Sequence, residues 1–126
     1  MKDYIEFLKN KRAISHNTGF EVNPDEITPS LYPHVKDTVR WAVTGGCRAI
    51  FSSFGMQKTV TQLEILRVIL KHKGGKGLIV CPKRVVTEFL TQAEQHLNLK
   101  VTYVRCMADV LICPTDIMIT NYERVR

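Results

Sequence analysis

The sequence predicts an α/β fold in which helices cover a parallel sheet. In the second half of the chain, short runs rich in Ile, Val and Leu alternate with longer amphipathic segments, and glycine or proline separates them. The order strand, helix, strand, helix, strand, strand is typical of parallel strands joined by crossovers. A length of 126 residues allows one domain, and a hydrophobic fraction of 44% predicts a core that needs no disulfide or metal.

The first third of the chain is expected to hold a helix, an irregular arm and a second helix. Apolar and charged side chains recur at helical spacing over residues 3–12, so we expect an amphipathic helix that docks on the main body. Residues 13–33 are rich in Asn, Gly and Pro, which prevents a long regular element. A short helix is expected over residues 36–43, with Trp41 in the core or, as the alternative, stacked on a nucleobase.

Beyond residue 46 the sequence predicts four strands and the helices between them. The expected strands are short apolar runs, residues 47–52, 77–81, 100–104 and 116–120. The expected helices have apolar positions at three-to-four spacing and cover residues 58–72, 85–98 and 108–111. In the first of them one stripe is expected to face the core, formed by Leu63, Leu66, Ile69 and Leu70. Ligands of such sheets bind beyond the carboxyl ends of the strands, which directs attention to the loop after residue 52.

That loop, from Ser52 to Thr59, is similar to the end of the phosphate-binding motif GxxxxGK[ST]. Lys58 at a helix start neutralises phosphates in such loops, the Thr59 hydroxyl binds Mg²⁺, and the free N–H groups of the first turn point at the anion. Ser52 and Gln57 replace the two motif glycines, while Gly55 remains. We expect the Gln57 side chain to clash with phosphate or to alter the loop dihedral angles. Alternatively, Lys58 and Thr59 simply begin a surface helix.

Composition excludes several classes of protein. The net charge of +6 suits contact with nucleic-acid phosphates, although many domains without a polyanion partner share it. The four cysteines form no CxxC pair and the histidines do not lie at zinc-ligand spacing, so we expect no zinc site. The chain has neither a signal-peptide pattern nor a long apolar stretch, and we therefore expect a cytoplasmic protein without a membrane partner.

The series of motifs resembles the N-terminal part of phage and prophage DEAD/DEAH-like helicases of the Swi/Snf type, in superfamily two. From about Thr18 to Arg126 the similar segments are GFEV, LYPHV, VRWA, GGCRAIF, FGMQKT, QLEI, LIVCP and ITNYERV. The resemblance implies a RecA-like, P-loop NTPase-like partial parallel sheet with flanking helices. It implies a helix and irregular arm over residues 1–35, a partial first helicase domain over residues 36–126, and a bacterial host cell as location.

The resemblance also implies ATP and Mg²⁺ as cofactors and DNA as a partner. The implied nucleotide-binding positions are His34, Gly55, Gln57, Lys58 and Thr59, of which Thr59 binds the Mg²⁺. The implied nucleic-acid-binding positions are Lys83, Arg84, Asn121, Tyr122 and Arg124. Val35 stands where these helicases have the glutamine that reads adenine, and together with Gln57 this predicts weak or absent ATP binding. Simple solvent exposure is the alternative explanation for Tyr122 and Arg124.

Three functional hypotheses remain open, and no catalytic residue is assigned. In such helicases the acidic Walker B box and the second RecA-like domain lie beyond the segment that this chain resembles. The first hypothesis is therefore a truncated helicase-like domain with weak or lost ATP binding, non-specific DNA contact and no hydrolysis alone. The second is a non-catalytic phage module, regulatory or anti-defence, that binds a host motor or defence complex. The third is an ATPase that borrows acidic residues from a partner chain. An open sheet edge also favours a homodimer.

Overall fold

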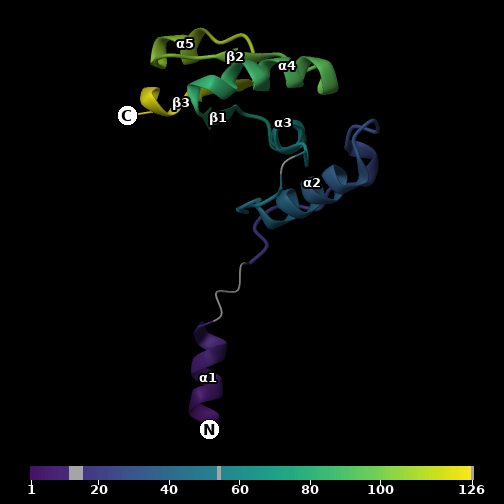
Figure 1. Cartoon of the computed structure of the whole chain (residues 1–126), viewed down its shortest axis with the longest axis vertical. Coiled ribbons are helices and arrows are strands. Elements are labelled where there is room, and N and C mark those ends of the chain that lie inside the picture. Colours follow the sequence, from purple (N-terminus) through teal and green to yellow (C-terminus); the bar gives the residue numbers. More distant parts are fainter. Residues whose placement is uncertain (12–15, 54, 126) are drawn as a thin grey trace.

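The computed structural model describes residues 1–11, 16–53 and 55–125, and it shows an α/β fold with a small parallel sheet (Figure 1). The sheet has the order β1-β3-β2 and consists of β1 (Gly77–Cys81), β2 (Val101–Tyr103) and β3 (Ile117–Asn121). Both pairings are parallel. The central strand β3 is buried at every residue, whereas β1 alternates between buried and exposed positions. The predicted α/β class and parallel sheet are confirmed.

The predicted strand over residues 47–52 is wrong. This segment has no regular structure, and the Phe51 side chain is 95% exposed. A groove of about 300 Å³ has Arg48 and Ile50 of this segment on its wall together with Leu78 of β1. A strand is stable only when its backbone N–H and C=O groups pair with a neighbouring strand. Because the segment lines a groove beside β1 instead of pairing with it, the sheet in the described part of the chain has three strands.

The predicted helices after the arm are confirmed, with shifted ends. They are α2 (Pro33–Gly45), α3 (Lys58–Lys73), α4 (Val86–Leu97) and α5 (Met107–Ile112). We expected one apolar stripe of α3 to face a single core, but the helix contributes residues to two cores. Leu63 is fully buried in a core with the strands and α4, whereas Val60 and Val68 are buried in a second core with α2 and the arm. The helix therefore lies between two cores and buries two of its sides.

The arm between the first two helices is irregular, as predicted, and it is part of the second core. Its N–H groups donate to the last carbonyl groups of α2, from Thr18 to Gly45 (3.1 Å), Gly19 to Thr44 (3.1 Å) and Phe20 to Val43 (3.3 Å). These bonds satisfy carbonyl groups that a helix end leaves without an internal partner. A 3-10 turn, Pro24–Glu26, follows, and Val22, Ile27 and Leu31 are buried against α2 and α3. Residues 13–15 of the predicted arm lie outside the described residues.

The N-terminal helix forms as predicted, but its expected docking on the main body is wrong. Helix α1 (Lys2–Lys11) is exposed at all ten residues, including Tyr4 (63%) and Phe7 (55%). Figure 1 shows it apart from the other elements. The buried valines of α2 and α3 pack against the arm, and no residue of α1 takes part in this core. Arg12, the last residue of the predicted helix, lies outside the described residues.

Candidate functional site

Helix α3 begins at Lys58, directly after the loop that the sequence predicts to bind phosphate. The helix ends at Lys73 and β1 begins at Gly77, and Leu63 of α3 packs in one core with Ile79 and Cys81 of β1. The N–H groups of the first turn of α3 have no partner within the helix and attract anions.

A cavity of about 340 Å³ opens at this helix start. Four of the predicted nucleotide-binding residues line it, namely Gly55, Gln57, Lys58 and Thr59. On the opposite wall it is lined by three polar side chains of α4, Glu88, Gln92 and His96, which follow each other at one helical turn. Sequence reasoning missed these three, since their spacing looks like an ordinary solvent face. The cavity thus combines a lysine, a hydroxyl group and the N-terminus of a helix with one carboxylate.

Gln57, directly before Lys58, has a left-handed backbone. Its φ of 53° and ψ of 48° are left-handed, and its carbonyl oxygen accepts bonds from the Thr61 amide (3.0 Å) and hydroxyl (2.8 Å). A residue with a Cβ is strained in this region by about 1 kcal/mol. Gly55 is also at positive φ (78°), and a Cβ there would meet nothing within 4 Å. The backbone at Gln57 is therefore strained where α3 begins.

A second cavity, of about 480 Å³, lies on the other side of the loop and contains His34. Its lining includes Trp41, Met56 and Thr61, and the His34 ring stacks on Tyr32 with centroids 5.8 Å apart. The prediction that Trp41 belongs to the core is wrong, because it is 51% exposed with the Arg48 guanidinium 5.4 Å from its ring centroid. A tryptophan in an apolar helix is usually buried, but here α2 turns its valines inward and leaves this ring on the rim of the cavity.

Val35, which stands in the position of the adenine-reading glutamine, is completely buried in the second core. Its side chain packs with the residues of the arm, α2 and α3 and not in the cavity that contains His34. Among the described residues, no group of three His, Cys, Asp or Glu side chains could hold a metal ion, and Thr59 is the one residue predicted to bind Mg²⁺.

The predicted nucleic-acid-binding residues meet at the ends of β1 and β3. The strand register places Cys81 opposite Asn121, so the turns Lys83–Val85 and Tyr122–Arg124 leave the sheet side by side. Lys83, Arg84, Tyr122 and Arg124 are exposed. Asn121 is buried instead, where its side chain accepts a bond from the Tyr103 hydroxyl (2.7 Å) and donates to the Glu123 carboxylate.

Glu123 is an acidic member of this basic cluster that was not among the predicted binding residues. Hydrogen bonds from its own backbone N–H and from the Asn121 side chain lower its pKa, and the positive charges of Lys83 and Arg124 lower it further. The carboxylate is therefore ionised at neutral pH, and it partly neutralises the positive surface that would face a phosphate backbone.

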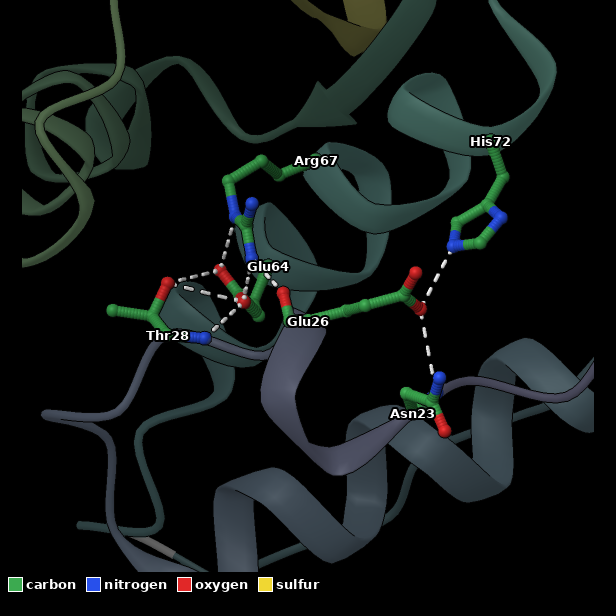
Figure 2. A network of polar contacts seen from close by, with 6 residues as sticks. All are labelled: Asn23, Glu26, Thr28, Glu64, Arg67 and His72. Carbon is green, nitrogen blue, oxygen red and sulfur yellow. Dashed lines mark hydrogen bonds and ion pairs between the residues drawn. The ribbon is translucent and has the colours of Figure 1, made fainter.

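A polar network joins the arm to α3 (Figure 2), and sequence reasoning missed it too. Glu64 is completely buried, and its carboxylate accepts bonds from the Thr28 N–H (2.9 Å), the Thr28 hydroxyl (3.1 Å) and Arg67 Nε (2.9 Å). Arg67 Nη2 bonds Glu64 (2.5 Å) and the Glu26 carbonyl (2.7 Å), while the Glu26 carboxylate pairs with His72 (2.8 Å).

The electrostatics of this network favour an ionised Glu64. Burial raises the pKa of Glu64, but the hydrogen bonds from Arg67 and Thr28 together outweigh it, so that the pKa lies below its ordinary value. Through Thr28 and the Glu26 carbonyl, this ion pair joins the arm to α3. The sequence signal was an acid–base pair at i and i+3, which on its own reads as a surface pair.

Compared with protein-family models and with curated proteins, the chain gives no match. Within the described ranges, no helix is both long and apolar enough to cross a bilayer.

Proposed function

We propose that this chain is a RecA-like module of the helicase type that holds nucleotide phosphate weakly at Lys58 and Thr59, contacts nucleic acid at the strand ends, and does not hydrolyse ATP alone. One observation carries the proposal. Lys58 and Thr59 begin a long helix and line a cavity at its start, and the residue before them has a left-handed backbone although it is a glutamine. An ordinary surface helix has no need of this strained entry.

The same residues support weak binding. In a phosphate loop the backbone closes on the anion at the position of Gln57, where a long side chain disfavours this close approach, and Val35 is buried in the core. Hydrolysis also requires groups that position Mg²⁺ and the attacking water. It further requires positive charge or hydrogen-bond donors that stabilise the transition state. Glu88 is the one carboxylate that lines the Lys58 cavity, and a single carboxylate does not supply all of these functions.

The nucleotide part is tested by calorimetry with Mg²⁺-ATP. We expect a dissociation constant in the millimolar range, about 4 kcal/mol of binding free energy, and loss of the signal in Lys58→Ala. Lys76→Ala, an exposed lysine outside the cavity, is the matched control and should leave the signal unchanged. A micromolar constant, or a millimolar signal that Lys58→Ala retains, contradicts the proposal.

The nucleic-acid part is tested by fluorescence anisotropy with a labelled single-stranded oligonucleotide over a salt series. We expect weak binding of any sequence, and a triple variant with Lys83, Arg84 and Arg124 changed to Ala should flatten the salt slope by about two to three units. Glu123→Gln should strengthen binding, because it removes a carboxylate from the same surface. Affinity that does not change with salt, or a triple variant that binds like the parent, contradicts DNA contact.

A second candidate function is a non-catalytic module that binds another protein, in the phage regulatory or anti-defence sense. The observation that favours it is exposed apolar surface, on α1 at Tyr4 and Phe7 and on α5 at Leu111 and Ile112, which are both 79% exposed. Apolar patches of this kind mark interaction surfaces. Light scattering over a concentration series distinguishes the outcomes: a defined assembly supports this candidate, and a monomer at all concentrations that binds no apolar dye contradicts it.

A further inference from the structure

A separate cavity lies at the opposite edge of the sheet, where the strands begin. It measures about 390 Å³, and its lining includes Ile117 at the start of β3 and Lys100 just before β2. Lys71, in the last turn of α3, lines it as well. Since a helix rises 1.5 Å per residue, Lys71 is roughly 20 Å from Lys58 along α3. The cavity is therefore distinct from the nucleotide site proposed above and does not depend on it.

Basic and apolar side chains line this cavity together. Three basic side chains line it, Arg67, Lys71 and Lys100, and three apolar ones, Leu70, Leu99 and Ile117. Asp116 is the one acidic residue among them. Small-ligand sites commonly have volumes of about 300–1,000 Å³, mostly apolar walls and a few polar groups that fix orientation. This cavity has that size, and it combines three apolar side chains with four charged ones.

Arg67 is held in position before any ligand arrives. Its Nε and Nη2 atoms are bonded to the buried Glu64 carboxylate, and Nη2 also bonds the Glu26 carbonyl (Figure 2). Nη1 takes part in none of these bonds. A guanidinium fixed on one side by a buried carboxylate loses little freedom when it binds an anion on the other side. Lys71 and Lys100 are exposed and contribute the positive charge that Glu64 does not compensate.

We propose that this cavity binds a small monocarboxylate with an apolar chain, the carboxylate at Arg67, Lys71 and Lys100 and the chain on Leu70, Leu99 and Ile117. The three apolar side chains disfavour a purely polar anion. Where such an anion touches them, it loses hydrogen bonds with water and gains none in return. Asp116 on the rim repels a second negative charge, which selects a monoanion over a dianion such as a phosphate ester.

The experiment is a titration of the full chain, labelled with ¹⁵N, with octanoate as the probe. We expect saturable shifts of the amide signals of residues 67–71, 99–100 and 116–117. Acetate, which lacks the chain, and 1-octanol, which lacks the charge, should each bind at least about fivefold more weakly. Equal binding of octanoate and octanol, or shifts confined to other surfaces such as α1, overturns the proposal.

Three variants test the assigned residues. The double variant Lys71→Gln/Lys100→Gln should weaken octanoate binding at least about fivefold, while Lys76→Gln, an exposed lysine outside the cavity, should change it less than about twofold. Asp116→Asn should strengthen binding about twofold or more, a gain that unfolding does not imitate. An affinity that the double variant leaves unchanged, or that Asp116→Asn weakens in a protein with the parent's spectrum, overturns the assignment.

Discussion

The buried carboxylate of Glu64 predicts a large and specific loss of stability in Glu64→Gln. The glutamine has the same shape, but one of its oxygens becomes an NH₂ group that faces a donor of Thr28 or Arg67. Breaking a buried ion pair costs about 3–5 kcal/mol. Because the Arg67 side chain is 23% exposed and finds water when released, we expect about 3 kcal/mol.

Urea unfolding followed by circular dichroism measures this loss. With an m-value of about 1.5 kcal/mol/M, the midpoint should fall by about 2 M without a change in slope. Glu94→Gln, at an exposed position of α4, is the matched control and should stay within about 0.5 kcal/mol. Thr28→Val removes the hydroxyl and keeps the backbone N–H donor, so it should cost about 1 kcal/mol. A Glu64→Gln protein as stable as the Glu94→Gln control refutes the reasoning.

The pH dependence gives an independent check on the same residue. The folded-state pKa of Glu64 lies below the ordinary value of 4.5, so its contribution to stability is complete above that value and disappears as pH falls through the folded pKa. Stability of the parent should therefore fall below about pH 5, and Glu64→Gln should lose less over the same range. Identical acid profiles of parent and variant would show that the carboxylate does not stabilise the fold.

Three other predictions follow from single positions. Gly19→Ala should lower the melting temperature strongly, because a Cβ there would lie 1.7 Å from the Val43 carbonyl oxygen; an unchanged melting curve contradicts the arm position. Trp41, the one tryptophan, should show emission of a half-exposed indole, and acrylamide should quench it more in Arg48→Ala; a blue-shifted, unquenched signal contradicts the assignment. Burial raises the pKa of the Cys81 thiol, so a thiol reagent should leave Cys81 unmodified in the native protein. A hydrogen bond with Thr115 is the main cause of the lowered pKa of Cys113, which should react at lower pH than an ordinary thiol. Mass spectrometry of the labelled peptides decides this.

Local patterns predicted the elements whose formation depends on local sequence. The helix over Lys58–Lys73 and the strands over Gly77–Cys81 and Ile117–Asn121 were all predicted, because each combines an apolar periodicity with glycine or a polar residue at its ends. The strand expected over residues 47–52 depends on a neighbour to pair with, and the sequence does not say whether β1 offers its free edge to it.

Only the part of the candidate site that depends on local sequence was predicted. Lys58 and Thr59 follow from a contiguous motif, so their place at the start of α3 was predictable. The lining by Glu88 and His96 depends on how α4 packs on the loop, and the burial of Glu64 depends on Thr28, which lies far away in sequence. Charged residues on helices are usually exposed, and only the tertiary fold shows which of them is buried.

The central claim is that a strained, side-chain-bearing residue limits phosphate binding at the start of α3. Calorimetry with Mg²⁺-ATP on the parent, on Gln57→Gly and on Gln57→Gly/Lys58→Ala tests it directly, with phosphate release measured on the same samples. The account predicts that Gln57→Gly binds about tenfold more tightly than the parent, that the added Lys58→Ala change abolishes this gain, and that none of the three proteins releases phosphate. Micromolar binding by the parent, or a Gln57→Gly protein that binds no better than the parent, would contradict it.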